Sequence, residues 1–375
     1  MTTSTTSTPT PLSPVRLGSL SLRNRLAVAP MTRVSASTDG TPTSEMASYY
    51  ADFARGGFGL VITEGVHPDL AESHGYENQP GLAGDSHVRG WSTVTAAVHD
   101  EGAHIVAQLM QSGALSQGNP HSTRTVGPSA VAPLGQMMPE YGGHGPWPTP
   151  DELGSDEIAA IVRGFAAAAR RAAAAGFDGV EVHGANGYLL DQFLTTYTNH
   201  RRDAYGGSVA NRVRLTAEVV AAVRDAVPGL VVGVRLSQTK VNDFHYRWPG
   251  GVDEARTIFT AVADAGATYI HVASEGRSWL STARLEGGDT ITRIARHVTG
   301  LPVIANGGMH DIDQTREVLA DEHADLVSIG HGALANPDLP QRIAAGRPLE
   351  LFDRSMLTPD VTLSNARRWR EDRAR

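Results

Sequence analysis

The chain of 375 residues contains no cysteine, which excludes disulfide bonds, thiolate nucleophiles and thiolate metal sites. Lysine occurs once, at Lys240, so a mechanism through a lysine imine has a single candidate. Runs of about eighteen apolar residues are also absent, which argues against a membrane-spanning helix and a membrane partner. The Thr- and Ser-rich start lacks the charged and apolar regions of a signal peptide, so a cytoplasmic location is expected by default.

The charge pattern and the missing motifs exclude further classes of function. A net charge of -8 with no basic tract argues against a nucleic-acid partner. The 15 histidines form neither H-x-H nor H-E-x-x-H, so no metal site is expected. A G-x-S-x-G nucleophile elbow is absent. Lys240 is expected in a loop beyond the fifth strand, which disfavours an imine-forming aldolase.

Short β-branched or apolar runs alternate along the chain with amphipathic segments of helical spacing, such as Ser155–Ala175, Val209–Val227 and Asp253–Ala265. Repeated alternation of strand and helix predicts a parallel sheet. Eight such units in about 320 residues fit a closed (β/α)8 TIM barrel better than an open sheet. The expected strands are Leu26–Ala29, Gly59–Thr63, His104–Leu109, Gly179–His183, Val231–Leu236, Tyr269–Ala273, Val303–Asn306 and Leu326–Ile329.

Segments outside this alternation predict the remaining organisation of an α/β fold. Val15–Leu22 alternates around Gly18 and Ser19, as expected for a β-hairpin that caps the bottom of the barrel. Gln111–Gly154 is long, irregular and rich in Gly and Pro, which is typical of a lid loop after strand three. The expected domain organisation is a disordered tail at 1–11, a single barrel domain at 12–350 and a C-terminal extension at 351–375.

The densest set of polar groups is His183-Gly-Ala-Asn186-Gly-Tyr188, which follows the apolar run Gly179–Val182. We interpret it as the loop that leaves this strand. Catalytic groups of such barrels gather at the C-terminal ends of the strands. An imidazole, a carboxamide and a phenol there can hydrogen-bond one substrate oxygen or donate a proton.

Other strand ends carry groups that suit a flat, partly anionic heterocycle. Pro30-Met31-Thr32 and Glu64-Gly65 end two strands, and Gln108 and Arg235 lie within two others. An isoalloxazine fits this set, because Arg235 would stabilise its reduced anion.

The last two strands lead into glycine-rich turns, Asn306-Gly307-Gly308 and Gly330-His331-Gly332. Glycine allows backbone N–H groups to approach a phosphate, and the phosphate site of these barrels commonly follows strands seven and eight.

From about Leu17 to Ile343 the chain resembles the Old Yellow Enzyme family of FMN-dependent ene-reductases. The segments that carry this resemblance are Leu22–Arg33, Gly59–Gly65, Ala107–Met110, Ala175–Phe193, Asn199–Gly207 and Ala335–Pro340.

The resemblance implies which steps of the reaction the flavin and the individual residues perform. His183 and Asn186 would bind the carbonyl or nitro oxygen of an activated alkene, flavin N5 would deliver hydride to the β-carbon, and Tyr188 would protonate the α-carbon. NADH or NADPH would first reduce the flavin at the same site, in a ping-pong cycle.

The resemblance also implies which residues hold FMN. The flavin ring would be held by Pro30, Thr32, Gly65, Gln108 and Arg235. The phosphate would be held by Gly307, Gly308 and Gly330. The full expected cofactor site is Pro30, Met31, Thr32, Gly65, Gln108, His183, Arg235, Asn306, Gly307, Gly308, Gly330 and His331.

Two segments depart from the family pattern. Where the family usually has Gly-Arg after the eighth strand, this chain has Gly330-His331, which predicts weaker and pH-sensitive retention of FMN. Where the family often has Gln-Leu-Trp-His-x-Gly-Arg, this chain has Gln108-Leu-Met-Gln-Ser-Gly-Ala114. Gln111 and Ala114 therefore replace a ring and a cation near the lid.

Two alternative functions stay open at this point: a biosynthetic flavoenzyme of the same fold that performs an oxidation or desaturation, and a barrel lyase or isomerase without a flavin. The choice between NADH and NADPH, and between a monomer and a homodimer, is also open. The size of the alkene would be set by the lid together with Trp147, Tyr76 and Trp279.

Overall fold

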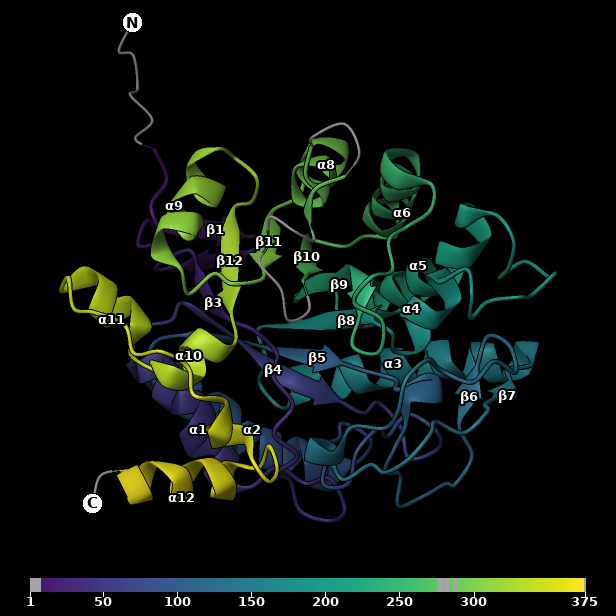
Figure 1. Cartoon of the computed structure of the whole chain (residues 1–375), viewed down its shortest axis with the longest axis horizontal. Coiled ribbons are helices and arrows are strands. Elements are labelled where there is room, and N and C mark those ends of the chain that lie inside the picture. Colours follow the sequence, from purple (N-terminus) through teal and green to yellow (C-terminus); the bar gives the residue numbers. More distant parts are fainter. Residues whose placement is uncertain (1–7, 275–278, 280–282, 286–288, 374–375) are drawn as a thin grey trace, which may run out of the picture.

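The computed structural model describes residues 8–274, 279, 283–285 and 289–373. Eight parallel strands close into a barrel with helices around it (Figure 1), which confirms the predicted (β/α)8 architecture. Around the barrel the strands are β3 (Leu26–Val28), β4 (Leu60–Val66), β5 (His104–Leu109), β8 (Gly179–Asn186), β9 (Val231–Lys240), β10 (Tyr269–Ala273), β11 (Val303–Asn306) and β12 (Leu326–Ile329).

Three strands, β4, β8 and β9, extend further than the sequence indicated. The β8–β9 ladder continues from His183 opposite Arg235 to Asn186 opposite Lys240, with a shift of register between Gly184 and Asn186. The prediction that His183–Asn186 is a loop was therefore wrong, and so was the placement of Lys240 in a loop. A bulge of this kind redirects side chains at the end of a strand without ending the pairing.

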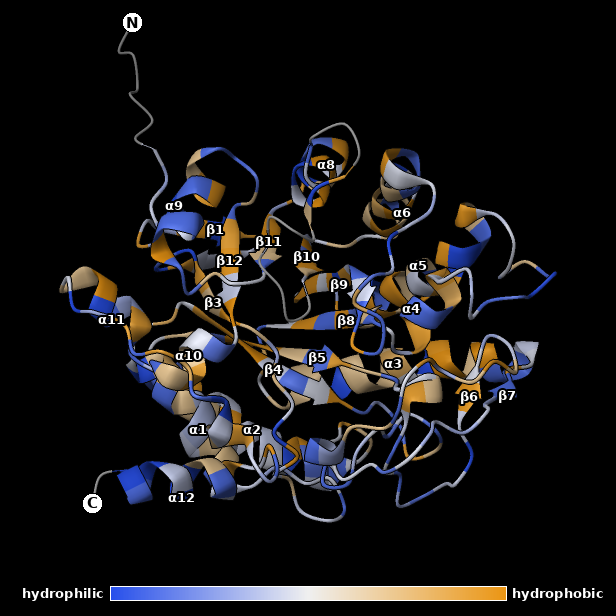
Figure 2. Cartoon of the chain, in the orientation of Figure 1, coloured by the Kyte–Doolittle hydropathy of each residue, from blue (hydrophilic) through white to orange (hydrophobic). Residues whose placement is uncertain are grey.

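The helices cover the outside of the barrel with their apolar faces turned inward. Figure 2 shows hydrophobic residues gathered on the strands and hydrophilic residues on the outer helices. In α3 (Ser155–Ala174), for example, Ile158, Phe165 and Ala169 are fully buried. The other helices are α1 (Ser44–Arg55), α2 (Asp85–Asp100), α4 (Leu189–Leu194), α5 (Val209–Ala226), α6 (Gly251–Asp264), α8 (Ile291–Thr299), α9 (Ile312–Ala320), α10 (His331–Ala335), α11 (Leu339–Ala344) and α12 (Leu363–Arg373). Within the described part of the chain, no helix combines the length and apolar character needed to cross a membrane.

The strands β1 (Val15–Leu17) and β2 (Leu20–Leu22) pair antiparallel and form the predicted hairpin. Leu17 and Leu22 are buried against residues at the starts of the barrel strands, including Leu60 and Val231. The turn requires glycine, because Gly18 has φ +58° and a Cβ there would lie 2.9 Å from Val231 Cγ1.

The long segment after β5 contains the short elements η1 (Gly113–Leu115), β6 (Val126–Gly127), η2 (Pro139–Tyr141) and β7 (Asp151–Glu152). A separate apolar cluster joins this segment to the barrel rim and to the C-terminal region, which includes η3 (Arg354–Leu357). Its buried members are Val34, Tyr76, Met110, Leu115, Trp147, Tyr188 and Val361. The lid and the C-terminal region therefore meet around Tyr188.

Candidate active site

The β8–β9 pairing places His183 beside Arg235, and both side chains are buried. Within the described part of the chain, the guanidinium of Arg235 makes one long hydrogen bond, 3.5 Å from Nη2 to Asn306 Oδ1. Arg235 Nε and His183 Nδ1 are buried and have no hydrogen-bond partner among the residues the structure describes. Buried polar atoms are nearly always paired in proteins, so this site calls for a ligand that accepts and donates hydrogen bonds.

The imidazole of His183 is held in its neutral form. Burial, then the positive charges of Arg235 and His271, place the pKa of His183 well below its ordinary value. A neutral imidazole can donate one hydrogen bond to a substrate oxygen and polarise it without transferring a proton completely.

Asn186 lies at the end of β8 in the left-handed backbone region, with φ +65°. Its N–H donates to Ser237 Oγ at 2.8 Å, which fixes the turn. The carboxamide oxygen of Asn186 is buried without a partner in the described structure. Asparagine tolerates this backbone conformation better than most residues. Asn186 therefore forms the turn with its backbone and leaves its side-chain amide available to a ligand.

Tyr188 precedes α4, and its ring meets the ring of His183 edge-on at 5.1 Å between centroids. Its hydroxyl is hydrogen-bonded to the hydroxyl of Tyr76, which is also buried. Tyr76 in turn packs against Tyr141 of the lid, with centroids 5.0 Å apart. The structure therefore adds Tyr76, which the sequence suggested only as a determinant of substrate size, to the surroundings of the phenol.

A buried polar layer that the sequence analysis missed lies beneath these groups. Gln108 Nε2 donates to Glu181 Oε1 at 2.8 Å, so the orientation of the Gln108 amide is fixed. The other carboxylate oxygen of Glu181 bonds His271 and Tyr269, each at 3.0 Å. Burial raises the pKa of Glu181, but His271, Arg235 and Gln108 outweigh it, and the carboxyl stays ionised. The alternation of Glu181 with His183 along one strand could have indicated that both point into the barrel.

Glu64, at the end of β4, holds the segment that follows β3. Its Oε2 accepts from the backbone N–H groups of Arg33 and Val34, at 2.8 and 3.0 Å. Burial raises the pKa of Glu64 to about 7. This carboxyl fixes the chain directly after Thr32, which is half-buried at the barrel rim together with Pro30 and Met31.

The ends of β11 and β12 have the backbone geometry expected for close approach to a ligand. Gly307 and Gly308 have φ values of +122° and +69°, which side chains disfavour. A Cβ at Gly330 would lie 3.6 Å from Met31 Sδ, so the end of β12 borders the end of β3. Gly65 is buried on the same rim, and its carbonyl accepts from Gln79 Nε2 at 2.7 Å.

Three of the sequence-predicted residues have contacts outside this group. His331 is exposed at the start of α10 and stacks on Phe352, with centroids 4.3 Å apart. Gln111 is buried and accepts from the N–H of Gly113 through its own side chain. Trp279 lines a separate small cavity with Gln238 and Asn306.

Comparison with known proteins identifies the family that shares this arrangement. The NADH:flavin oxidoreductase / NADH oxidase family matches residues 12–350. The chain belongs to this family.

Relatives of this family agree with the barrel fold. A probable flavin mononucleotide-dependent alkene reductase of Leishmania infantum is 38% identical over 349 residues, covering 91% of this chain and 92% of that protein. The structure of the old yellow enzyme homologue from Zymomonas mobilis has a TM-score of 0.83 at 31% identity, covering 96% and 98% of the two chains. Morphinone reductase in complex with tetrahydroNAD has a TM-score of 0.83 at 35% identity, covering 93% and 94%. The chain is thus an FMN-dependent NAD(P)H oxidoreductase of the Old Yellow Enzyme type.

The residues on the rim fit FMN. The unpartnered Arg235 Nε suits an electron-rich edge of the flavin ring, and the Gly307–Gly308 backbone leaves room for a phosphate.

Proposed function

We propose that the protein reduces activated C=C bonds of α,β-unsaturated carbonyl or nitro compounds, with NADH or NADPH as the reductant. The observation that carries this proposal is the neutral, buried His183, whose Nδ1 has no partner among the described residues, beside Asn186 and next to the phenol of Tyr188. When bound, FMN supplies hydride transfer from the nicotinamide and then to the alkene.

The protein's part at the cofactor is to bind and orient it. Arg235 would stabilise negative charge on the reduced ring, and Gln108 would present an amide that Glu181 holds in place. The remaining ring contacts would come from Pro30, Met31, Thr32, Gly65 and His183, and the phosphate contacts from Asn306, Gly307, Gly308, Gly330 and His331.

His183 and Asn186 would hydrogen-bond the carbonyl or nitro oxygen of the alkene. These bonds strengthen as negative charge develops on that oxygen, so they stabilise the transition state more than the bound substrate. Tyr188 would then give its proton to the α-carbon, and Tyr76 would orient the phenol for this transfer.

The test of the function begins with the absorption spectrum of the purified protein with FMN, followed by anaerobic titration with NADH and NADPH. The reduced protein is then mixed with a panel of enones and nitroalkenes, and reoxidation of the flavin is followed. We expect flavin bands, bleaching by at least one nicotinamide, and rapid reoxidation by alkenes. A protein that stays colourless with FMN would contradict any flavin function. Absence of anaerobic reoxidation would instead favour the oxidation or desaturation alternative.

FMN is expected to dissociate more readily as the pH rises from 6 to 8. Partial desolvation of the ring, then the charges of Arg354 and His310, lower the pKa of His331 in the free protein, so its ring is neutral at pH 7. A phosphate dianion beside it would raise that pKa, so FMN binding takes up a proton. Retention is then strongest at low pH and is lost as the pH rises through the pKa of the bound state.

Measurement of FMN dissociation by fluorescence across this pH range checks the prediction. His331→Arg should bind FMN more tightly and abolish the pH dependence, because a guanidinium is always charged. Tight, flat profiles in both proteins would show that His331 does not contact the phosphate.

Tyr76→Phe is expected to slow alkene reduction by about 10-fold to 100-fold, because a hydrogen bond to a group that develops charge contributes roughly 1.5–3 kcal/mol. Flavin reduction by the nicotinamide should change little. Tyr141→Phe keeps the ring contact with Tyr76 and serves as the matched control. Equal rates in wild type and Tyr76→Phe, measured by rapid mixing, would remove Tyr76 from the proton-donor site.

A further inference from the structure

The Asn186–Tyr188 turn is held by residues outside the site described so far. Gly187, between the two functional residues, has φ +89° and follows the left-handed Asn186. Its N–H donates to Asp191 Oδ2 at 2.7 Å, and its carbonyl accepts from Gln192 Nε2 at 2.7 Å. Two side chains of α4 therefore bind Gly187 through both its N–H and its carbonyl.

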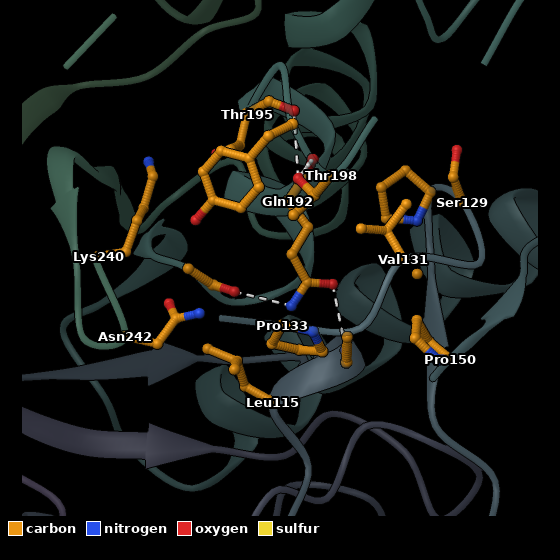
Figure 3. Close-up of a pocket in the computed structure, with 15 residues that line it drawn as sticks. Leu115, Ser129, Val131, Pro133, Pro150, Gln192, Thr195, Thr198, Lys240 and Asn242 are labelled. Carbon is orange, nitrogen blue, oxygen red and sulfur yellow. Dashed lines mark hydrogen bonds between the residues drawn. The ribbon is translucent and has the colours of Figure 1, made fainter. Parts of the chain in front are cut away.

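Gln192 connects the turn to the start of the lid. Its Oε1 accepts from the N–H of Ala114 at 3.1 Å, while its Nε2 also donates to the carbonyl of Ser112 at 3.3 Å. Figure 3 shows the Gln192 amide hydrogen-bonded to neighbouring residues of the pocket lining, with Lys240 and Asn242 on one side of the pocket and Val131 and Pro150 on the other. Ala114 stands at one of the positions where the lid sequence departs from the family pattern.

Asp191 is fully buried, and its charge is balanced by Lys240, the only lysine of the chain. Lys240 Nζ lies 2.6 and 2.7 Å from the two oxygens of Asp191 and 3.5 Å from the carbonyl of Ser237. Lys240 is also the β9 residue paired with Asn186, and the N–H of the following Val241 donates to the Asn186 carbonyl at 3.1 Å. The ion pair thus joins α4 to the end of β9 on either side of the turn.

We propose that Lys240 and Asp191 are positioning residues of the alkene-reducing site, because their buried ion pair holds Gly187 and thereby aims Asn186 and Tyr188 at the substrate. This inference rests on the proposed function. A buried carboxylate without its cation would take up a proton or pull water inward, and either change loosens the bond to the Gly187 N–H. Misplacement of catalytic groups by about 1 Å can cost about 10²-fold in rate.

Burial opposes both charges of the pair. It lowers the pKa of Lys240, which Asp191 partly restores, and it raises the pKa of Asp191, which Lys240 partly offsets. Loss of Lys240 would therefore raise the pKa of Asp191 further. The other titratable groups that face the pair are Asp243, Glu254, Tyr197 and Tyr246.

The experiment compares wild type, Lys240→Met and the double variant Lys240→Met/Asp191→Asn. We expect Lys240→Met to reduce alkenes about 10-fold to 100-fold more slowly at pH 6.5, with flavin reduction by the nicotinamide less affected. Its alkene rate should rise with pH as Asp191 ionises, because only the carboxylate gives Gly187 a charge-assisted acceptor. The double variant lacks both charges of this pair and keeps an acceptor oxygen for Gly187, so it should recover most of the rate and lose the pH dependence.

A second measurement tests the ion pair without reference to activity. Because Lys240 is the only lysine, labelling with 15N-lysine gives a single side-chain signal in the FMN-loaded protein. We expect a charged ammonium with slow hydrogen exchange in wild type, and faster exchange in Asp191→Asn. Arg201→Met, which removes a buried cation that does not contact Gly187, is the control for general destabilisation.

The outcomes separate this inference from the proposed function. An unchanged alkene rate and pH profile in Lys240→Met, or a double variant no faster than the single one, would overturn the positioning role. A fast-exchanging lysine signal in wild type would overturn the ion pair itself. Wild-type protein that fails to reduce any alkene but shows the protected ammonium would overturn the proposed function and leave the ion pair in place.

Discussion

His183→Phe is expected to lower kcat/KM for alkene reduction by about 10²-fold to 10³-fold, which corresponds to roughly 2.7–4 kcal/mol of barrier. Phenylalanine fills the buried position of His183 and keeps an edge contact with Tyr188, but it cannot donate to the substrate oxygen. The loss should fall on the transition state, where negative charge on that oxygen is greatest. Steady-state kinetics with an enone, at matched FMN occupancy, measures the effect.

His183→Asn is the matched control, because an amide is also a neutral hydrogen-bond donor and should restore part of the rate. The pH dependence adds a further test. Since burial and the neighbouring cations keep the pKa of His183 well below 6.5, its protonation should not appear in the rate between pH 6 and 8. A steep loss of activity across this range in wild type that disappears in His183→Asn would mean that the imidazole titrates and is not a fixed neutral donor.

The barrel was largely predictable because each unit repeats the same physical pattern. Each unit is an apolar run followed by a helix that begins near an acidic or hydroxyl residue, so the pattern can be recognised from residues close together in the sequence. Eight such units commonly close into a parallel barrel. The strand ends were harder to place, since the β8–β9 ladder continues through polar residues to Lys240 by means of a bulge. Hydrogen bonding between strands, which is not local in sequence, decides where such a strand ends.

The rim residues were predictable as chemical types, but their supports were not. His183, Asn186 and Tyr188 lie within one short segment, so their spacing alone brings them together. Glu181 binds Gln108 of the adjacent strand, and Tyr76 binds Tyr188, over separations of 73 and 112 residues along the chain. Contacts of this kind depend on the closed fold, and a single sequence shows only that each polar residue occurs in an otherwise apolar context.

Tyr188→Phe is expected to slow the reduction of enones by about 10²-fold to 10⁴-fold, the usual contribution of a positioned general acid. Phenylalanine keeps an aromatic ring in the apolar cluster that also contains Met110, Leu115 and Trp147, so the lid should stay in place. Only the proton donor is lost. Rapid mixing of the reduced enzyme with an enone measures the affected step, and anaerobic reduction by NADPH or NADH should change by less than about threefold because that step takes no proton from the phenol.

The choice of alkene makes this prediction specific to proton transfer. Hydride addition to a nitroalkene leaves a nitronate, whose negative charge is spread over two oxygens, so this product needs no immediate proton from the protein. Flavin reoxidation by a nitroalkene should therefore survive in Tyr188→Phe while reoxidation by an enone is lost. An equal loss with both substrates would mean that Tyr188 positions the alkene, and an equal retention would mean that the proton comes from another donor. Only a selective loss with the enone fits Tyr188, oriented by Tyr76, as the acid of this site.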